Sequence, residues 1–414
     1  MASHMITGRA SPRGVLLACT VGNAVSVTPA VHAVFGLFLL PLSQEFGWAR
    51  ASISVVLGIL ALVGAVMYPF IGRYIDSHGA RRTLLIGVVG LAFSIAALAL
   101  VNGSLIQFYA TFSVLALFGA MAGTPIYQKL IADWFDRNRG TALGISAGVG
   151  CGVGSVIFPA LAAMLVSGQG WRVGYLGIAA VMLLVALPIL HLLLHDRPAS
   201  GPAEAVTARE GLSPGEAART PAFWLILIAI ASGAGCTTAI FSHVVPILSD
   251  RGFSLATGTV VVSVFALVTS GWQIATGRIM DMVRSPRIVV PMYLLAVPGL
   301  VMLEFGRSMP ELIGGGVMLG MALGAQFGAL PYFVARYFGV HSFGTIIGAM
   351  YSAVIGVQGT TPILLDAAYD RLHSYHDALF VAGVCLSAGA ILLLFLPRYG
   401  RSEEGAGDLL LHGI

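Results

Sequence analysis

A few ionisable side chains stand inside long apolar runs, where they could bind a solute or a proton. Lys129 is the only lysine of the chain and lies in "PIYQKLIADWF", four residues before Asp133. A charge in such surroundings is costly unless it faces a cavity or a partner, so each one is a candidate site. Two interpretations stay open. Lys129 snorkels to a polar interface and pairs with Asp133, or it lines a central cavity and receives a carboxylate.

Two histidines, His32 and His243, lie in the first and the seventh apolar run. A histidine titrates near neutral pH and can carry a proton where carboxylates are scarce. The alternative for each is a packing residue whose ring nitrogens are satisfied. Asp366 is the one acidic residue that could lie within an apolar run, unless it marks the end of that run.

Amide and phenol side chains complete the candidate site. Gln273 and Gln326 can bind a carboxylate or a hydroxyl group without a charge. Tyr127 and Tyr332 could cap the same cavity, or pack as ordinary aromatic side chains. These four residues join the lysine and the two histidines as the predicted substrate-binding set.

The residue pattern favours binding over catalysis. The sequence has no Walker loop, no H-E-x-x-H pair and no nucleophile elbow between a strand and a helix. The four cysteines stand singly in apolar runs, which predicts packing residues and no disulfide or metal site. We therefore expect no enzyme activity, no cofactor and no bound metal.

The apolar runs themselves identify the class of protein. Hydrophobic residues make up 57% of the 414 residues, charged residues make up 10%, and the mean hydropathy is +0.90. A soluble domain carries about 25% charged residues, and a helix of ~20 residues crosses a bilayer. The chain is predicted to be an all-α integral membrane protein. Its twelve predicted spans are 14–40, 51–71, 83–101, 106–132, 140–166, 173–194, 221–247, 256–276, 287–305, 310–335, 343–368 and 377–397.

A polar stretch rich in Pro, Gly, Ala and Glu, residues 196–219, follows the sixth run and predicts a flexible cytoplasmic linker. It separates an N-terminal six-helix bundle, 1–195, from a C-terminal six-helix bundle, 220–402. Residues 403–414 are predicted to form a cytoplasmic tail, and "MASHM", residues 1–5, is set aside as a cloning remnant.

The arginines predict the orientation in the membrane. If both termini are cytoplasmic, the inner segments hold 16 arginines and the outer loops hold 5. Positive charge accumulates on the cytoplasmic side of membrane proteins, so we expect a multi-pass protein of the bacterial inner membrane with both termini inside. The net charge of +4 follows from this topology, and no nucleic-acid partner is expected.

The sequence repeats itself at a nearly constant offset. "WFDRNRGTALG" (134–144) is echoed by "YFGVHSFGTIIG" (337–348). Five residues recur 205 positions later: Pro41, Gly47, Gly72, Arg73 and Asp76 become Pro246, Gly252, Gly277, Arg278 and Asp281. A duplicated six-helix unit, with its two copies related by an axis along the membrane normal, explains this register.

The segment "GRYIDSHGARR" (72–82) resembles the G-x-x-x-D-x-x-G-x-R-R loop of major facilitator transporters. Its glycines let helices approach closely, and Asp76 can lie near a helix N-terminus or an arginine. The alternative is a plain positive-inside anchor. We predict a latch that joins the two halves on the inner side and breaks when they rock. The predicted gating residues are Gly72, Arg73, Asp76, Arg81, Arg82, Asp133, Gly277, Arg278 and Asp281.

Two longer segments, "FGLFLLPLSQEFGWARASIS" (35–54) and "WFDRNRGTALGISAGVGCGVG" (134–154), resemble the monocarboxylate and oxalate transporter branch. The resemblance runs over nearly the whole chain. It implies the major facilitator fold and the movement of a small organic acid, often with a proton. The branch commonly has an arginine where Gln273 stands and a lysine where Met350 stands, and related bacterial chains have acidic residues near Gln326.

We therefore expect a secondary transporter that moves a monocarboxylate-like organic anion by rocking of its two halves, and acts as a symporter if protons are coupled. Two alternatives stay open. One is a facilitator or exporter of a neutral or larger amphipathic solute, and the other is a membrane sensor that does not transport. The expected partners are a small-molecule substrate, protons and the lipid bilayer. The expected assembly is a monomer.

Overall fold

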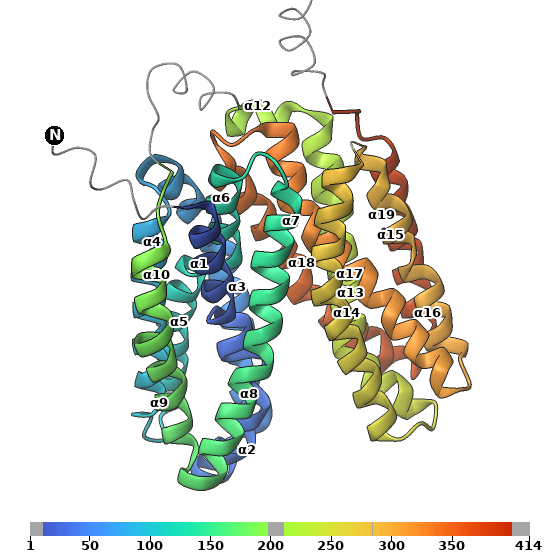
Figure 1. Cartoon of the computed structure of the whole chain (residues 1–414). Helices are drawn as coiled ribbons and strands as arrows, with labels where there is room; N and C mark the ends of the chain where they lie inside the picture. The colour runs from blue at the N-terminus through green and yellow to red at the C-terminus, as the bar shows by residue number, and fades with distance from the viewer. Residues whose placement is uncertain (1–10, 198–210, 284, 400–414) are drawn as a thin grey trace, which may run out of the picture.

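The protein is a bundle of long helices (Figure 1). The computed structural model describes residues 11–197, 211–283 and 285–399. Within these residues, 12 helical stretches are long and apolar enough to cross a membrane, and each overlaps one of the predicted spans. Outside the helices, the described residues contain one isolated bridge, between Gly211 and Gly339. The predicted all-α membrane fold with twelve spanning helices is confirmed.

The first six spans form one half of the bundle (Figure 1). Three of these spans contain a π-helical turn, a local widening of the helix that is frequent at functional sites. One such turn contains Pro29, which has no N–H to continue the helical ladder. The elements are α1 (Pro12–Ala24), η1 (Thr28–His32), α2 (Phe35–Phe46), α3 (Arg50–His78), α4 (Arg81–Leu98), α5 (Leu105–Met121), α6 (Thr124–Trp134), α7 (Arg139–Gly144), η2 (Ile145–Val149), α8 (Gly150–Gln169), α9 (Trp171–Val181), η3 (Met182–Ala186) and α10 (Leu187–Leu193).

The last six spans form the other half, preceded by a short helix. Side-chain caps begin several of these helices, and the Ser254 hydroxyl, for example, accepts the Thr257 N–H and so satisfies a free donor of the first turn. The elements are α12 (Pro214–Arg219), α13 (Pro221–Asp250), α14 (Leu255–Met282), η4 (Pro286–Ile288), α15 (Val289–Leu294), α16 (Ala296–Phe305), α17 (Met309–Phe338), α18 (Phe343–Leu372) and α19 (His376–Leu394).

Each half buries its own hydrophobic core. One cluster of buried residues extends from Val15 to Leu194, and the other extends from Ala217 to Leu396 with Ala132 added from the first half. Large apolar side chains also cover the outside of the bundle, where they suit contact with lipid. The predicted remnant, the middle of the predicted linker and the predicted tail lie outside the described residues.

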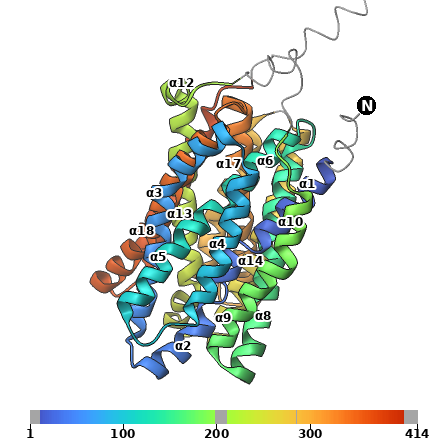
Figure 2. The same cartoon turned by 90° about the vertical axis from the view of Figure 1, so that its left-hand side faces the viewer.

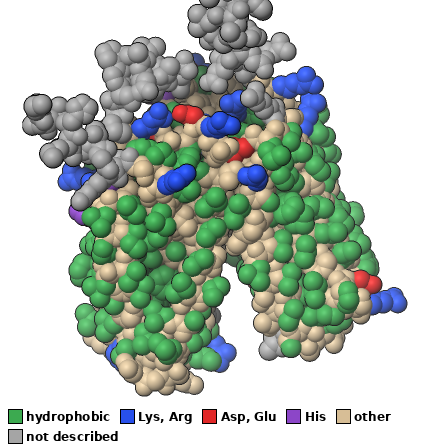
Figure 3. Space-filling view, viewed as in Figure 1, with side chains coloured by type: hydrophobic (Ala, Val, Ile, Leu, Met, Phe, Trp, Pro, Cys, Tyr) green, Lys and Arg blue, Asp and Glu red, His purple; other side chains and the backbone are tan. Residues whose placement is uncertain are grey.

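The two halves touch at one end of the bundle and separate at the other (Figure 3). We call the first the linker end, because α12, the short helix before α13, lies there in both ribbon views (Figure 2). The second, the open end, holds the turns α2–α3, α8–α9 and α13–α14. At the linker end α3 lies against α18, and α14 lies against α7. A cleft therefore runs between the halves from the open end towards these contacts.

Two glycine pairs permit the close contact at the linker end. A Cβ atom added to Gly72 would collide with the carbonyl oxygen of Gly344, and one added to Gly277 would collide with the carbonyl oxygen of Gly140. In both cases the obstacle is backbone of the other half, which cannot move aside as a side chain can. The predicted role of Gly72 and Gly277 in close helix approach agrees with this geometry.

We expect Gly72→Ala to open the linker end. Overpacking of this kind costs about 1–3 kcal/mol, which shifts the equilibrium between the two end states by roughly 5- to 150-fold. The measurement is the distance between spin labels at Gly168→Cys on α8 and Ala256→Cys on α14, two exposed positions at the open end. This label pair, in a variant with the native cysteines replaced, should report a shorter distance in Gly72→Ala.

Gly58→Ala, on the same helix, is the matched control, because a Cβ atom there would meet no other atom within 4 Å. The control should leave the distance distribution unchanged. An unchanged distribution in correctly inserted Gly72→Ala would contradict the role given to this contact.

Candidate functional site

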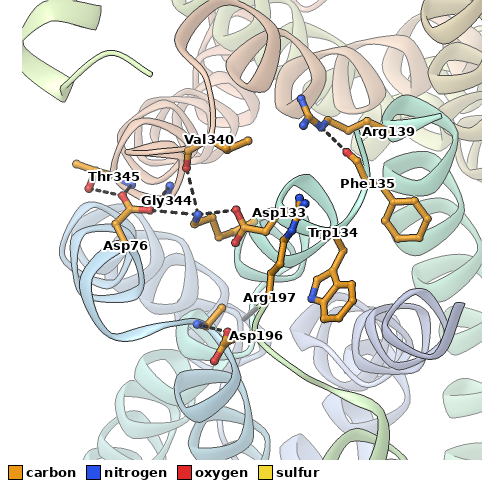
Figure 4. Close-up of polar contacts among 12 residues, drawn as sticks. Asp76, Asp133, Trp134, Phe135, Arg139, Asp196, Arg197, Val340, Gly344 and Thr345 are labelled. Carbon is orange, nitrogen blue, oxygen red and sulfur yellow. Dashed lines mark hydrogen bonds and ion pairs between the residues drawn. The ribbon is translucent and has the colours of Figure 1, made fainter. Parts of the chain in front are cut away.

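Asp76 joins the two halves at the linker end (Figure 4). It lies near the end of α3, and its carboxylate accepts the backbone N–H of Gly344 at 2.8 Å and of Thr345 at 2.7 Å. The Thr345 hydroxyl donates a third bond at 2.8 Å. Gly344 and Thr345 open α18, where the first N–H groups lack helical partners and the helix dipole favours a negative charge. Asp76 therefore caps a helix of the opposite half.

Asp281 makes the equivalent contact from the C-terminal half, as the twofold repeat of the sequence requires. It lies near the end of α14 and accepts the backbone N–H of Gly140 at 2.9 Å and of Thr141 at 2.7 Å, and the Thr141 hydroxyl at 2.7 Å. These residues open α7. The two carboxylates are 205 positions apart and their threonine partners are 204 apart, so the sequence repeat is also a repeat of contacts. We call the two contacts the latches.

Lys129 lies beside the first latch. Its ammonium donates to the Asp133 carboxylate at 2.7 Å and to the Val340 carbonyl of the other half at 3.1 Å. Its nitrogen is also 3.9 Å from the Asp76 carboxylate. The i,i+4 pair with Asp133 that was one of the two sequence interpretations is therefore present. Lys129 is 9% exposed, so this charge is held mainly by its partners.

The arginines predicted to gate take different places. Arg73, Arg82 and Arg278 are exposed, whereas Arg81 is half-buried and donates to the His191 carbonyl at 3.0 Å. Asp196 is not among the residues predicted from the sequence. Its carboxylate accepts the N–H of Ala80 at 2.8 Å and of Arg81 at 3.0 Å and so caps α4. Nothing near Asp196 in the sequence indicates a helix more than 100 residues away.

Further into the bundle, a second set of polar contacts crosses between the halves. The Gln128 amide of α6 donates to the Tyr351 hydroxyl of α18 at 3.1 Å, and the Tyr351 ring lies 6.3 Å from the ring of Tyr68 on α3. The Ser352 hydroxyl donates to the Ala65 carbonyl of α3. These contacts close the bottom of the cleft on the side of the latches. Gln128 and Tyr351 were not predicted from the sequence.

Two of the predicted binding residues are buried with an unpaired polar atom. Gln326 on α17 accepts the Thr237 hydroxyl at 3.1 Å, and its amide nitrogen has no partner among the described residues. The Tyr127 ring is buried against Gly22, and its hydroxyl also lacks a described partner. A buried donor without a partner costs about 1–3 kcal/mol. A polar ligand that bonds to either group in another conformation of the protein would remove this cost.

The other amide and the other phenol of the predicted binding set lie elsewhere. The backbone carbonyl of Gln273, on α14, is packed between Gly144 of the opposite half and Gly328 of α17. The Tyr332 hydroxyl donates to the Met280 carbonyl at 3.0 Å, next to the second latch. The structure therefore brings Gln273 to the boundary between the halves and places Tyr332 at the linker end.

The histidines differ from each other. His32, in the π-turn η1, is exposed, whereas His243 on α13 is buried. The Nε2 atom of His243 lies 2.8 Å from the Asp366 carboxylate of α18, and its Nδ1 atom lies 2.8 Å from the Ala239 carbonyl. Each of the two residues is a candidate on its own in the sequence, and nothing in the sequence indicates that they pair. Among the described residues, no group of three or more His, Cys, Asp or Glu side chains could hold a metal ion.

The geometry, two six-helix halves with mirrored latches, agrees with a family comparison. The sequence profile of the Major Facilitator Superfamily matches residues 17–358. The chain belongs to this superfamily. A solved structure, described as a major facilitator superfamily transporter, FucP, in the outward conformation, has a TM-score of 0.72 at 14% identity and covers 92% of this chain and 98% of its own. The superfamily membership and the fold predicted from the sequence are both confirmed, and they point to a transporter rather than an enzyme.

Three curated relatives are similar over most of their length. An MFS-type transporter of Gibberella moniliformis is 25% identical, covering 84% of this chain and 83% of its own. The oxalate:formate antiporter of Oxalobacter formigenes is 22% identical, with 94% and 91% covered. The multidrug resistance protein MdtG of Dickeya zeae is 27% identical, with 72% of each chain covered.

Proposed function

We propose that this superfamily member is a secondary transporter of a small organic acid that works by rocking of its two halves. The observation that carries the proposal is the pair of mirrored latches at one end of an open cleft. Each latch joins the halves through backbone donors and a carboxylate, without covalent or metal links. Such contacts can form and break during a transport cycle, which alternating access requires.

The linker end is proposed to face the cytoplasm of a bacterial cell, with both termini on that side. On the face shown in Figure 3, more Lys and Arg side chains lie at this end than at the open end. This bias supports the orientation through the positive-inside rule. In that orientation, the structure is open to the outside and closed to the cytoplasm. A monomer suffices, because both latches form within one chain.

The organic-acid substrate is supported by similarity to the oxalate:formate antiporter over 94% of this chain. The predicted set of Lys129, His32, His243 and the amides and phenols supplies cationic and neutral donors that suit a carboxylate. Coupling to protons belongs to this proposal and would use the histidines. The alternative is a neutral or larger amphipathic solute, favoured by the uncharged Gln273 and Gln326 and by the likeness to a multidrug resistance protein.

The test is uptake into proteoliposomes of radiolabelled oxalate and formate, with a neutral sugar for comparison. We expect saturable uptake of at least one acid. Gln326→Leu, which removes the buried amide, should weaken apparent affinity by roughly 3- to 10-fold, the value of one ordinary hydrogen bond. Gln169→Leu, at an exposed position at the end of α8, should have no effect.

Uptake of the neutral solute alone would support the alternative substrate class. Absence of flux with every solute would support a membrane sensor that kept the fold and lost transport. Protein-free liposomes and vesicles made leaky with detergent control for diffusion and trapping.

A further inference from the structure

One helix, α18, carries polar contacts at four levels along its length. Thr345, Tyr351, Gln358 and Asp366 follow one another at spacings of six to eight residues. Thr345 and Tyr351, the two nearer the linker end, bond to the N-terminal half. Gln358 and Asp366, the two nearer the open end, bond to α13 of their own half, through Thr238 at 2.8 Å and His243 at 2.8 Å.

The division fits a structure closed at one end. Where the halves meet, α18 bonds across the boundary, and where they part, its polar side chains bond to α13. The Asp366 side chain is 61% exposed, whereas His243 is buried. Asp366 lies six residues before the last residue of α18, and an exposed carboxylate suits water and not lipid. Closing of the open end over this carboxylate would remove it from water.

The contacts of His243 tie its protonation to Asp366. Its Nδ1 atom lies 2.8 Å from the Ala239 carbonyl and 2.9 Å from the Ser242 hydroxyl, and its Nε2 atom lies 2.8 Å from the Asp366 carboxylate. If Nδ1 donates to the carbonyl, the Nε2 contact needs a further proton, because two acceptors repel at this distance. If Nδ1 accepts from Ser242, Nε2 donates to Asp366 and the pair keeps one negative charge that a further proton would neutralise. In both arrangements the pair can hold one proton more than a neutral ring beside a carboxylate.

Acidic groups lie around a tyrosine beside the pair. The Tyr375 ring lies 6.1 Å from the His243 ring and stacks on Tyr369 of α18. Burial raises the pKa of the Tyr375 hydroxyl, and the carboxylates of Asp250 and Asp366 raise it further, followed by Tyr369 and Asp370. The acidic groups around Tyr375 thus come from α13 and from α18.

The basic and remaining titratable groups near this end have other partners or are exposed. On α19, His376 lies 3.1 Å from Glu304 of α16. Arg251, after α13, donates to backbone carbonyls at the end of α16. Glu311 of α17 accepts backbone N–H groups of its own N-terminus. Arg371 at the end of α18 is exposed. Among the described residues, none of these groups bonds to His243 or Asp366.

We propose that His243 and Asp366 form the proton-binding site of this transporter, and that closing of the open end is linked to the uptake of one proton by this pair. The inference rests on the transport cycle proposed above and adds to it the site and the sign of the coupling.

The reaction is a simple proton transfer. A proton from water binds to the pair, which gives an imidazolium beside the Asp366 carboxylate and a net charge of zero. Loss of the proton returns it to water and leaves a neutral ring beside a carboxylate, with a net negative charge. The neutral pair can be closed off from water at lower cost than the lone charge. Acidic pH should therefore favour the closed form of the open end.

The experiment measures the label pair at Gly168→Cys and Ala256→Cys in nanodiscs between pH 4 and pH 8.5. We expect the short distance to gain population as the pH falls. His243→Gln should move the midpoint of this response to lower pH, because the proton would then have only the Asp366 carboxylate to bind. Asp366→Asn should favour the short distance even at the alkaline limit.

His376→Gln is the matched control, because His376 also pairs with a carboxylate at the open end but on the exposed surface of α16 and α19. It should keep the midpoint of the parent protein. A parent protein without a pH-dependent distance would overturn the proposal, and so would a parent midpoint retained by both His243→Gln and Asp366→Asn. Each variant is first shown to be monodisperse and inserted.

Exchange of labelled oxalate and formate at equal pH on both sides separates this inference from the proposed function. If exchange fails while the distance still titrates through His243, the substrate assignment is wrong and the proton site stands. If exchange proceeds and neither variant changes the pH response, transport stands and this proton site is wrong.

Discussion

Asp76→Asn is expected to shift the protein from the state closed at the linker end to the state closed at the open end. The Asp76 side chain is 12% exposed and accepts three hydrogen bonds at the start of α18. Asparagine keeps one acceptor but loses the charge that the helix N-terminus and Lys129 favour. Hydrogen bonds to a charged group contribute about 1.5–3 kcal/mol, so the equilibrium should change by roughly 10- to 150-fold.

Asp281→Asn should have an effect of similar size, because the second latch has the same three donors. The latches are separate sites that open together in one rocking motion. Their free energies should therefore add, and the double variant should populate the short open-end distance as its main form. Solute flux should fall in all three variants, because a transporter that rests in one end state completes fewer cycles.

Asp136→Asn is the matched control for both latches. Asp136 lies at the same end with a side chain that is 72% exposed, and it pairs with Arg139 and Arg197 of its own half. Exposed pairs of this kind contribute under about 1 kcal/mol. If Asp76→Asn and Asp281→Asn leave the label distances and the flux at the level of this control, the latches do not set the equilibrium.

Properties that depend on neighbouring residues could be predicted from the sequence, and pairings between distant helices could not. The twelve spans follow from local hydropathy, and the Lys129–Asp133 pair follows from the helical repeat. The capping of a helix by Asp76 was one of two alternatives. Its partner Thr345 could have been found, since "GT" occurs at the same place in "WFDRNRGTALG" and "YFGVHSFGTIIG".

The contacts that the sequence did not reveal depend on the relative height of two helices in the bundle. His243 and Asp366 are 123 residues apart, and their contact depends on how far α13 and α18 are shifted along each other. The same holds for Gln128 and Tyr351, whose contact exists only while the halves are closed at the linker end. Periodicity gives the face of a helix on which a residue lies, but not its level against a distant partner.

Lys129→Gln is expected to act through the first latch. The lysine joins Asp133, Asp76 and the Val340 carbonyl, so its loss leaves two carboxylates without a cation and weakens a contact between the halves. Breaking a buried ion pair costs about 3–5 kcal/mol. The Asp133 side chain is 23% exposed, and solvent screening lowers the expected cost to about 2–4 kcal/mol. The label pair should again report a shorter open-end distance.

A second substitution separates the two interpretations of Lys129. In Lys129→Gln with Asp133→Asn, no unpaired Asp133 charge remains, so the double variant should recover much of the parent distance distribution. Lys129→Arg should keep only part of the parent distance distribution, because the planar guanidinium has a different reach. If Lys129 instead receives the substrate carboxylate, Lys129→Gln should weaken oxalate or formate binding by roughly 10- to 100-fold without a change in distance. Asp133→Asn would then bring no recovery, since a carboxylate substrate needs the cation whether or not its neighbour is charged.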